Sequence, residues 1–332
     1  MSRPRVLVVS LGGTITMTSS GTGGVVPTLT AADLVASVPP LSEVADIEAL
    51  SRFGLASGSL TLAHLREVAA LLRARFDDGA IDGAVIVQGT DTIEDTAFVL
   101  DRLVGPGRAV AVTGAMRSPQ MPGADGPANL LAAVRAAADP QLRRTGVVAV
   151  INDEIHAARW VQKSHTALTS AFTSPSNGRI GIVSEGRVRL SMLPILPATL
   201  PDIDPATLTR SCAVAQVPLG LDEDGRLLAS LAALGYEGAV IEAMGAGHVP
   251  AAAVARIADL VATMPVVLCS RVRGGPVFTR TYGYAGSEMD LIARGVIASG
   301  ELSPSKARLL LALLLASGAS PQAVRDAFAV PA

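Results

Sequence analysis

Aromatic side chains are scarce in this sequence, where Phe, Trp and Tyr together make up 3% of 332 residues. Apolar residues nevertheless reach 49% and charged residues only 17%, a balance typical of a globular protein. The core must therefore be built mainly from Ala, Val, Leu and Ile. A chain of this length can bury a large core and can form two domains.

Concentrated charge is absent as well. The formal net charge is -2, and no block of like charges occurs. Because phosphate recognition needs a concentrated basic face, we expect no nucleic acid partner. Cysteine occurs only at Cys212 and Cys269, in different apolar stretches without partner histidines nearby. This spacing predicts two buried thiols rather than a disulfide framework or a zinc site.

Long apolar runs are also missing, since no stretch approaches the roughly 20 residues that span a bilayer. The run 309–316 is bordered by charged Lys306 and Arg308, which indicates a buried helix. The run 6–10 is too short for a signal-peptide core and continues directly into a glycine motif. These features predict a soluble, cytoplasmic protein without membrane contact.

Short apolar runs bounded by Gly or Pro alternate with longer Ala-, Leu- and Arg-rich segments, the pattern of an α/β fold with a parallel sheet. In the first part of the chain, strands are predicted over 6–10, 83–87, 109–113 and 146–151. Helices are predicted over 31–38, 61–76, 92–103 and 126–138.

A proline-rich stretch over 190–219 has little helical period and separates this part from a second, smaller α/β set. We predict an N-terminal domain over 1–189 with a mostly parallel sheet flanked by helices, a linker over 190–215, and a smaller α/β C-terminal domain over 216–332. Strands of the second set are predicted at 239–242 and 266–268, and helices near 251–263, 305–316 and 321–327. Ser303 and Pro304 suit an N-cap and the first helical residue.

Two motifs place a threonine directly after a predicted parallel strand: Gly12-Gly13-Thr14-Ile15 and Gln88-Gly89-Thr90-Asp91-Thr92. Ligands bind at the carboxyl edge of open α/β sheets, and glycine allows the backbone to approach a ligand closely. Neither motif has the G-x-G-x-x-G spacing of a dinucleotide site. Each alone also permits a plainer interpretation, a strand-to-loop turn for the first and a helix N-cap for the second.

In combination with other segments, these motifs resemble the bacterial L-asparaginase/glutaminase family of threonine amidohydrolases. The resemblance covers nearly the whole chain. The further segments that carry it are 114–117 (Gly-Ala-Met-Arg), 124–127 (Ala-Asp-Gly-Pro), 159–166 around Lys163, and the tail 298–308.

The resemblance implies a double displacement on the side-chain amide of L-asparagine, with L-glutamine as a second substrate. Thr14 would be the nucleophile, and Thr90, Asp91 and Lys163 would form a proton-relay set beside it. A lysine in that role needs a lowered pKa or acts electrostatically on a neighbouring hydroxyl. Without the resemblance, the sequence favours a solvated surface lysine at position 163. No metal or organic cofactor is implied.

The resemblance also implies a substrate-binding set of Ser57, Gln88, Gly89, Ala115, His248 and Glu288. Backbone N–H groups at Gly89-Thr90 or near Ala115 would stabilise the oxyanion. Asp91 would pair with the substrate ammonium group, and Ser57 with its carboxylate. Glu288 corresponds to a glutamate supplied by a neighbouring subunit, which implies a homodimer or homotetramer with sites at subunit interfaces.

Three departures from the family pattern leave alternatives open. Residues 18–30 contain no tyrosine where better-known members carry an activating one, although glycines within 19–24 suit a mobile lid. Gln88 replaces a histidine, and His248 replaces an asparagine. An enzyme acting on another small amide therefore remains possible, as do an ammonia-producing amidotransferase subunit and a non-catalytic amino-acid-binding protein. The sequence does not determine whether asparagine or glutamine is the preferred substrate.

Overall fold

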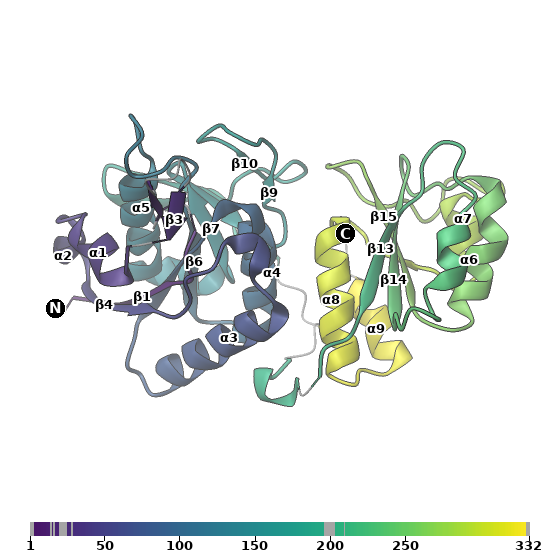
Figure 1. The fold of residues 1–332 in the computed structure, drawn as a ribbon, viewed down its shortest axis with the longest axis horizontal. Coiled ribbons are helices and arrows are strands. Elements are labelled where there is room, and N and C mark those ends of the chain that lie inside the picture. The colour runs from purple at the N-terminus through teal and green to yellow at the C-terminus, as the bar shows by residue number, and fades with distance from the viewer. Residues whose placement is uncertain are drawn as a thin grey trace. The chain divides into compact units, whose positions relative to one another are not determined.

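The apolar runs of the first part of the chain form the middle of an eight-stranded sheet (Figure 1). The structure is a computed structural model that describes residues 3–13, 15, 17–19, 25–27, 29–195, 203–208 and 210–329. In sheet order, the strands are β12 (Arg187–Leu190), β11 (Gly181–Ser184), β8 (Glu154–Ala157), β7 (Val148–Ile151), β6 (Ala109–Thr113), β5 (Gly83–Val87), β1 (Arg5–Ser10) and β4 (Asp46–Ser51). The strands from β4 to β7 are parallel, and each strand beyond β7 is antiparallel to its neighbour. A mostly parallel sheet is thus confirmed.

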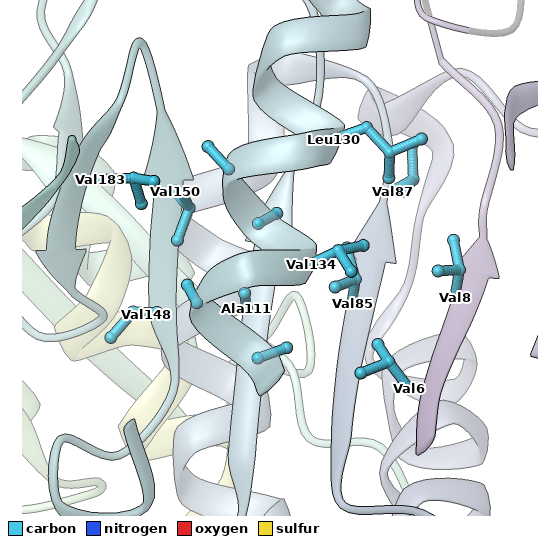
Figure 2. Close-up of a cluster of buried hydrophobic side chains, with 14 of the residues drawn as sticks. Val6, Val8, Val85, Val87, Ala111, Leu130, Val134, Val148, Val150 and Val183 are labelled. Atoms are coloured by element: carbon cyan, nitrogen blue, oxygen red, sulfur yellow. The ribbon is translucent and has the colours of Figure 1, made fainter. Parts of the chain in front are cut away.

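The central strands are buried on both faces, as parallel strands require. Every residue of β5 and β6 is buried, and so is all of β1 except Arg5. Helix α5 (Gly126–Ala138) lies against one face, where Leu130 lies beside Val87 and Val134 beside Val85 of β5 (Figure 2). Valines from β1 and β7 belong to the same buried cluster. A Cβ on Gly83 would lie 2.0 Å from Ala137 O, so glycine allows the helix to approach the sheet this closely. Small aliphatic side chains therefore fill this core, as the low aromatic content predicts.

Helices α3 (Leu62–Asp77) and α4 (Ile93–Val104) pack together on the other face of the sheet (Figure 1). Both confirm the predicted helices to within one residue. The start of α3 has a capping box, in which the Thr61 hydroxyl accepts from the N–H of His64. Two short helices, α1 (Ala31–Ala36) and α2 (Leu41–Val44), complete this unit near its β4 edge.

The edge strands were not predicted from the sequence. Strand β4 exposes part of both faces and shows neither a continuous apolar run nor strict alternation. Two small hairpins were also missed: β2 (Met17–Ser19) with β3 (Val25–Pro27), and β9 (Gln162–Lys163) with β10 (Phe172–Thr173). Strands this short bury too little to leave a pattern.

The second unit has its own parallel sheet and its own core. Its strands, in order, are β13 (Val214–Pro218), β14 (Gly238–Ala243), β15 (Val266–Ser270) and β16 (Ile297–Ala298). Its helices are α6 (Val254–Val261), α7 (Glu288–Ala293), α8 (Pro304–Ala316) and α9 (Pro321–Phe328). Helix α8 packs on β13, β14 and β15, and the Ser303 hydroxyl accepts from the N–H of Lys306 with Pro304 at the first helical position. The predicted cap and the buried helix over 309–316 are therefore confirmed.

The chain divides into two compact units, Met1–Leu196 and Pro197–Ala332. Strand β13 begins at Val214, inside the predicted linker, and the domain limits 1–189, 190–215 and 216–332 stay a prediction. Cys212 and Cys269 are both free and buried, as predicted. No helix among the described residues is long and apolar enough to cross a membrane.

Candidate active site

The loops that follow β1, β4, β5 and β6 are bonded to one another at the carboxyl edge of the large sheet. Leu11 N–H donates to Val87 O at 2.8 Å, and Leu55 N–H donates to Leu11 O at 3.0 Å. Gln88 N–H donates to Thr113 O at 3.0 Å. These backbone bonds hold the two glycine-threonine motifs beside each other, as expected for the ligand edge of an α/β sheet.

Glycine is required where these loops meet. Gly13 has a φ of +92°, and a Cβ there would lie 1.9 Å from Gly89 N. A Cβ on Gly89 would lie 2.7 Å from Ser57 Oγ. Thr14, the predicted nucleophile, lies outside the described residues, but both of its neighbours are described. Ile15 is buried, and a Cβ on Gly126 would lie 2.9 Å from its Cγ1.

Lys163 meets the second motif with its side chain. Its Nζ donates to Thr90 Oγ1 at 2.9 Å and to Asp91 Oδ1 at 2.7 Å. The Lys163 side chain is 17% exposed, Thr90 is buried, and the Asp91 side chain is 74% exposed. The arrangement joins a charged donor, a hydroxyl and a carboxylate with a face open to solvent, so the carboxylate can also receive a substrate cation.

The lysine is held in addition by a residue that the sequence analysis missed. The backbone N–H of Lys163 donates to Glu94 Oε2 at 2.6 Å. Glu94 lies in the first turn of α4, two residues after the Gln88–Thr92 motif. Its place in a first turn could have been read as ordinary helix-end charge, so only the long-range contact distinguishes it.

Gln88 is fully buried, and its side chain connects the loops of the site through hydrogen bonds. Its Nε2 donates to Thr92 Oγ1 at 3.0 Å and to Gly89 O at 3.2 Å. The Thr92 hydroxyl in turn donates to Ser57 O at 3.1 Å. Thr92 precedes α4 without a side-chain cap bond, and Thr90 begins a short 3-10 turn, so neither threonine acts as the simple helix cap of the plainer interpretation.

The segment after β6 is fixed by a carboxylate. The N–H groups of Met116 and Arg117 donate to the two oxygens of Asp125 at 3.0 and 2.9 Å. Asn129 Nδ2 donates to Gly114 O at 3.0 Å. Ala115, predicted to bind substrate, is buried within this braced turn. Asp125 falls in a motif that the sequence analysis singled out, whereas Asn129 was missed.

The two remaining predicted residues, His248 and Glu288, lie together in the second unit. His248 Nε2 is 3.3 Å from Glu288 Oε2. Oε1 of Glu288 accepts from the N–H groups of Thr281 and Tyr282 at 3.0 and 2.7 Å. The His248 ring also contacts the rings of Tyr282 and Tyr284 edge-on, at 4.9 and 5.6 Å between centroids.

Glu288 is completely buried, yet its environment favours the ionised form. Burial raises the pKa of this carboxyl, but the N–H groups of Tyr282, Thr281 and Glu288 itself, together with His248, outweigh the effect. The pKa therefore lies below its usual 4.5.

The described part of the chain contains no group of three or more His, Cys, Asp or Glu side chains arranged to hold a metal ion. Burial raises the pKa of the Cys269 thiol to about 12, so this thiol does not supply a nucleophile at neutral pH.

Two family models together match most of the chain. The model for the N-terminal domain of asparaginase matches residues 5–195, and the glutaminase/asparaginase C-terminal domain matches residues 213–328. An L-asparaginase of Bacillus licheniformis is 34% identical over 326 residues, covering 98% of both chains. A probable L-asparaginase of Deinococcus radiodurans is 35% identical over 331 residues, again covering 98% of both.

A solved structure agrees with these sequence matches. The crystal structure of a probable cytoplasmic L-asparaginase from Campylobacter jejuni has a TM-score of 0.88 and 29% identity, and the match covers 99% of this chain and 100% of that chain. The similarity thus runs through both units and includes the segments that form the carboxyl edge described above. The chain belongs to the L-asparaginase/glutaminase family.

Proposed function

We propose that this protein hydrolyses the side-chain amide of L-asparagine to L-aspartate and ammonia. The observation that carries the proposal is the placement of Lys163 Nζ, which donates to both Thr90 Oγ1 and Asp91 Oδ1 at the ligand edge of the sheet. The names of the relatives support asparagine as the substrate. A cytoplasmic location is part of the same proposal.

Thr14 is the proposed nucleophile. Its hydroxyl oxygen attacks the amide carbon of the substrate, the C–N bond breaks, and ammonia leaves after the nitrogen takes up a proton. Water then attacks the acyl-enzyme ester, which releases L-aspartate and restores the hydroxyl. The position of Gly13 against Gly89, and of Ile15 against Gly126, supports placing the nucleophile at this edge.

Lys163 acts on the reaction through Thr90. As a charged donor, its ammonium stabilises negative charge at Thr90 Oγ1 while that hydroxyl relays a proton. Within the segment after β6, the N–H groups of Met116 and Arg117 are already bonded to Asp125. We therefore assign the oxyanion role in this segment to the N–H of Ala115.

A free amino acid substrate also brings an ammonium and a carboxylate group. The exposed Asp91 carboxylate pairs with the ammonium, and the Ser57 hydroxyl donates to the carboxylate. Gly89 allows the loops to approach the substrate. Gln88 supports the site indirectly, because its buried side chain donates a hydrogen bond to Thr92.

His248 and Glu288 complete the proposed site from a neighbouring subunit. Both lie in the second unit, where His248 Nε2 is 3.3 Å from Glu288 Oε2. The active form is accordingly a homodimer or homotetramer, and light scattering after size-exclusion chromatography measures which. A monomer with full activity would exclude this part of the proposal.

The test is ammonia release by the purified protein from L-asparagine, with L-glutamine in a parallel reaction. Release from asparagine, abolished in Thr14→Ala, supports the proposal. The absence of a tyrosine in residues 18–30 favours one competing function, a non-catalytic amino-acid-binding protein. Calorimetric binding of asparagine without ammonia release would identify that function, and release from another small amide alone would redefine the substrate.

A further inference from the structure

Lys163 is tied to one short segment of the chain at two separate places. Its Nζ reaches Thr90 and Asp91, and its backbone N–H reaches the Glu94 carboxylate at 2.6 Å. We propose that Glu94 is a positioning residue, which fixes the main chain of Lys163 so that its ammonium meets Thr90. This inference rests on the proposed function, in which Lys163 serves the reaction.

The side-chain contacts alone are a weak anchor for this lysine. The Asp91 partner is largely exposed, and ion pairs of that kind contribute little in water. The lysine side chain has four flexible carbons, so its ammonium can reach several positions from one backbone site. Strand β9 is two residues long, and within the described part of the chain its sheet partner is β10. A contact outside this sheet pairing then helps to hold the hairpin against α4.

Glu94 has the chemistry for that task. A carboxylate accepts a hydrogen bond from a backbone N–H more strongly than a neutral acceptor does. Glu94 lies in the first turn of α4, where the helix dipole favours an anionic side chain. The contact joins residues 69 positions apart and links α4 to the β9 hairpin. It therefore sets the distance between the lysine backbone and the Thr90 turn.

The sequence supplies an unusually clean way to observe this contact. Of its 27 basic residues, only Lys163 and Lys306 are lysines. Lys306 lies in α8 of the second unit and is 1% exposed. Selective isotope labelling of lysine therefore gives two side-chain signals by NMR, one at the site and one that serves as an internal control.

The test compares three variants in kcat and KM for L-asparagine. Glu94→Ala removes the acceptor and should lower kcat roughly 10- to 100-fold, since a displacement near 1 Å has effects of that order. KM should change less than about threefold. Glu94→Gln keeps an oxygen acceptor and should retain kcat to within about fivefold. The matched control is Asp95→Asn, which removes a charge from the same helical turn and should leave kcat within about twofold.

The NMR measurement separates this inference from the proposed function. Glu94→Ala should move the Lys163 signal and leave that of Lys306 unchanged, and this holds even if the wild-type protein releases no ammonia. An unmoved Lys163 signal would overturn the inference. So would equal losses of kcat in Glu94→Ala and Asp95→Asn, which indicate a general effect on the helix. A Glu94→Gln variant as slow as Glu94→Ala, with the Lys163 signal at its wild-type position, would assign the effect to charge, and the positioning role would be wrong.

Discussion

Replacing Gly13 by alanine tests the contact on which the whole site depends. The added Cβ would lie 1.9 Å from Gly89 N and 2.3 Å from Gly89 Cα. Both neighbours are backbone atoms, so no side chain can rotate away. The loops must separate by at least 1.1 Å to reach the 3.0 Å below which Cβ contacts are essentially never found.

The expected loss of catalytic activity follows from this displacement of the two loops. The movement falls on the loop that carries Thr14 and on the loop that carries Thr90 and Asp91. A misplacement of 1 Å can lower a rate about 100-fold, equivalent to about 2.7 kcal/mol of transition-state stabilisation. We therefore expect Gly13→Ala to lower kcat/KM for L-asparagine at least about 100-fold. The left-handed backbone adds roughly 1–2 kcal/mol of strain in the folded state.

A second glycine separates the clash from the strain. Gly107 has a φ of +80°, and a Cβ there would meet no described atom within 4 Å apart from its own chain neighbours. It lies just before β6, at the amino edge of the same sheet, away from the loops of the site. Gly107→Ala should lower the melting temperature through strain but keep kcat/KM within about twofold. If folded Gly13→Ala retained kcat/KM within about threefold of wild type, the convergence of the two loops would not govern activity.

Three further changes give distinct results. Lys163→Arg keeps the charge but replaces a compact ammonium with a planar fork, so kcat should fall at least about 100-fold; a rate near wild type would show that charge alone suffices. Asp101→Ala should reduce unfolding free energy by about 3–5 kcal/mol in urea titrations, because both side chains of the Asp101–Arg102 pair are 8% exposed and the arginine loses its partner; a change below about 1 kcal/mol would contradict this reasoning. The pKa of Glu288 is lowered in the folded chain, so its ionised form stabilises the fold above pH 4.5, and this contribution is lost as the pH falls through the lowered value. The melting temperature of wild type should consequently fall more steeply below pH 4.5 than that of Glu288→Gln, and parallel curves would exclude this role.

The parts of the fold that were predictable are those buried on both faces. Strands β5 and β6 are continuous apolar runs because α5 covers one face and α3 and α4 cover the other. Strand β4 has one strand neighbour and exposed residues along its length, so nothing in its composition distinguishes it from a loop. Its pairing with β1 is determined by the tertiary fold, which local strand propensity does not reveal.

The residues of the site likewise fall into those that could be predicted from the sequence and those that could not. The glycines and threonines of the two motifs could be found because backbone contact and strand-end position restrict the residue type. Glu94 and Asn129 could not, since both act through long-range hydrogen bonds to main-chain atoms. A carboxylate in a first helical turn and an amide in a helix both have ordinary explanations at the level of sequence. Only the fold brings Glu94 to the N–H of Lys163.

The composition carries one further indication of the site. A chain with 27 basic residues and two lysines supplies its surface charge almost entirely with arginine. The two lysines are the exceptions to that usage: Lys163 is 17% exposed and Lys306 is 1% exposed, so neither serves as ordinary surface charge. At position 163 the reason is chemical, since three donors on one tetrahedral nitrogen can reach Thr90 and Asp91 together, whereas a guanidinium directs its donors within a plane. In this arginine-rich chain, the lysine at position 163 therefore marks a site that needs an ammonium group.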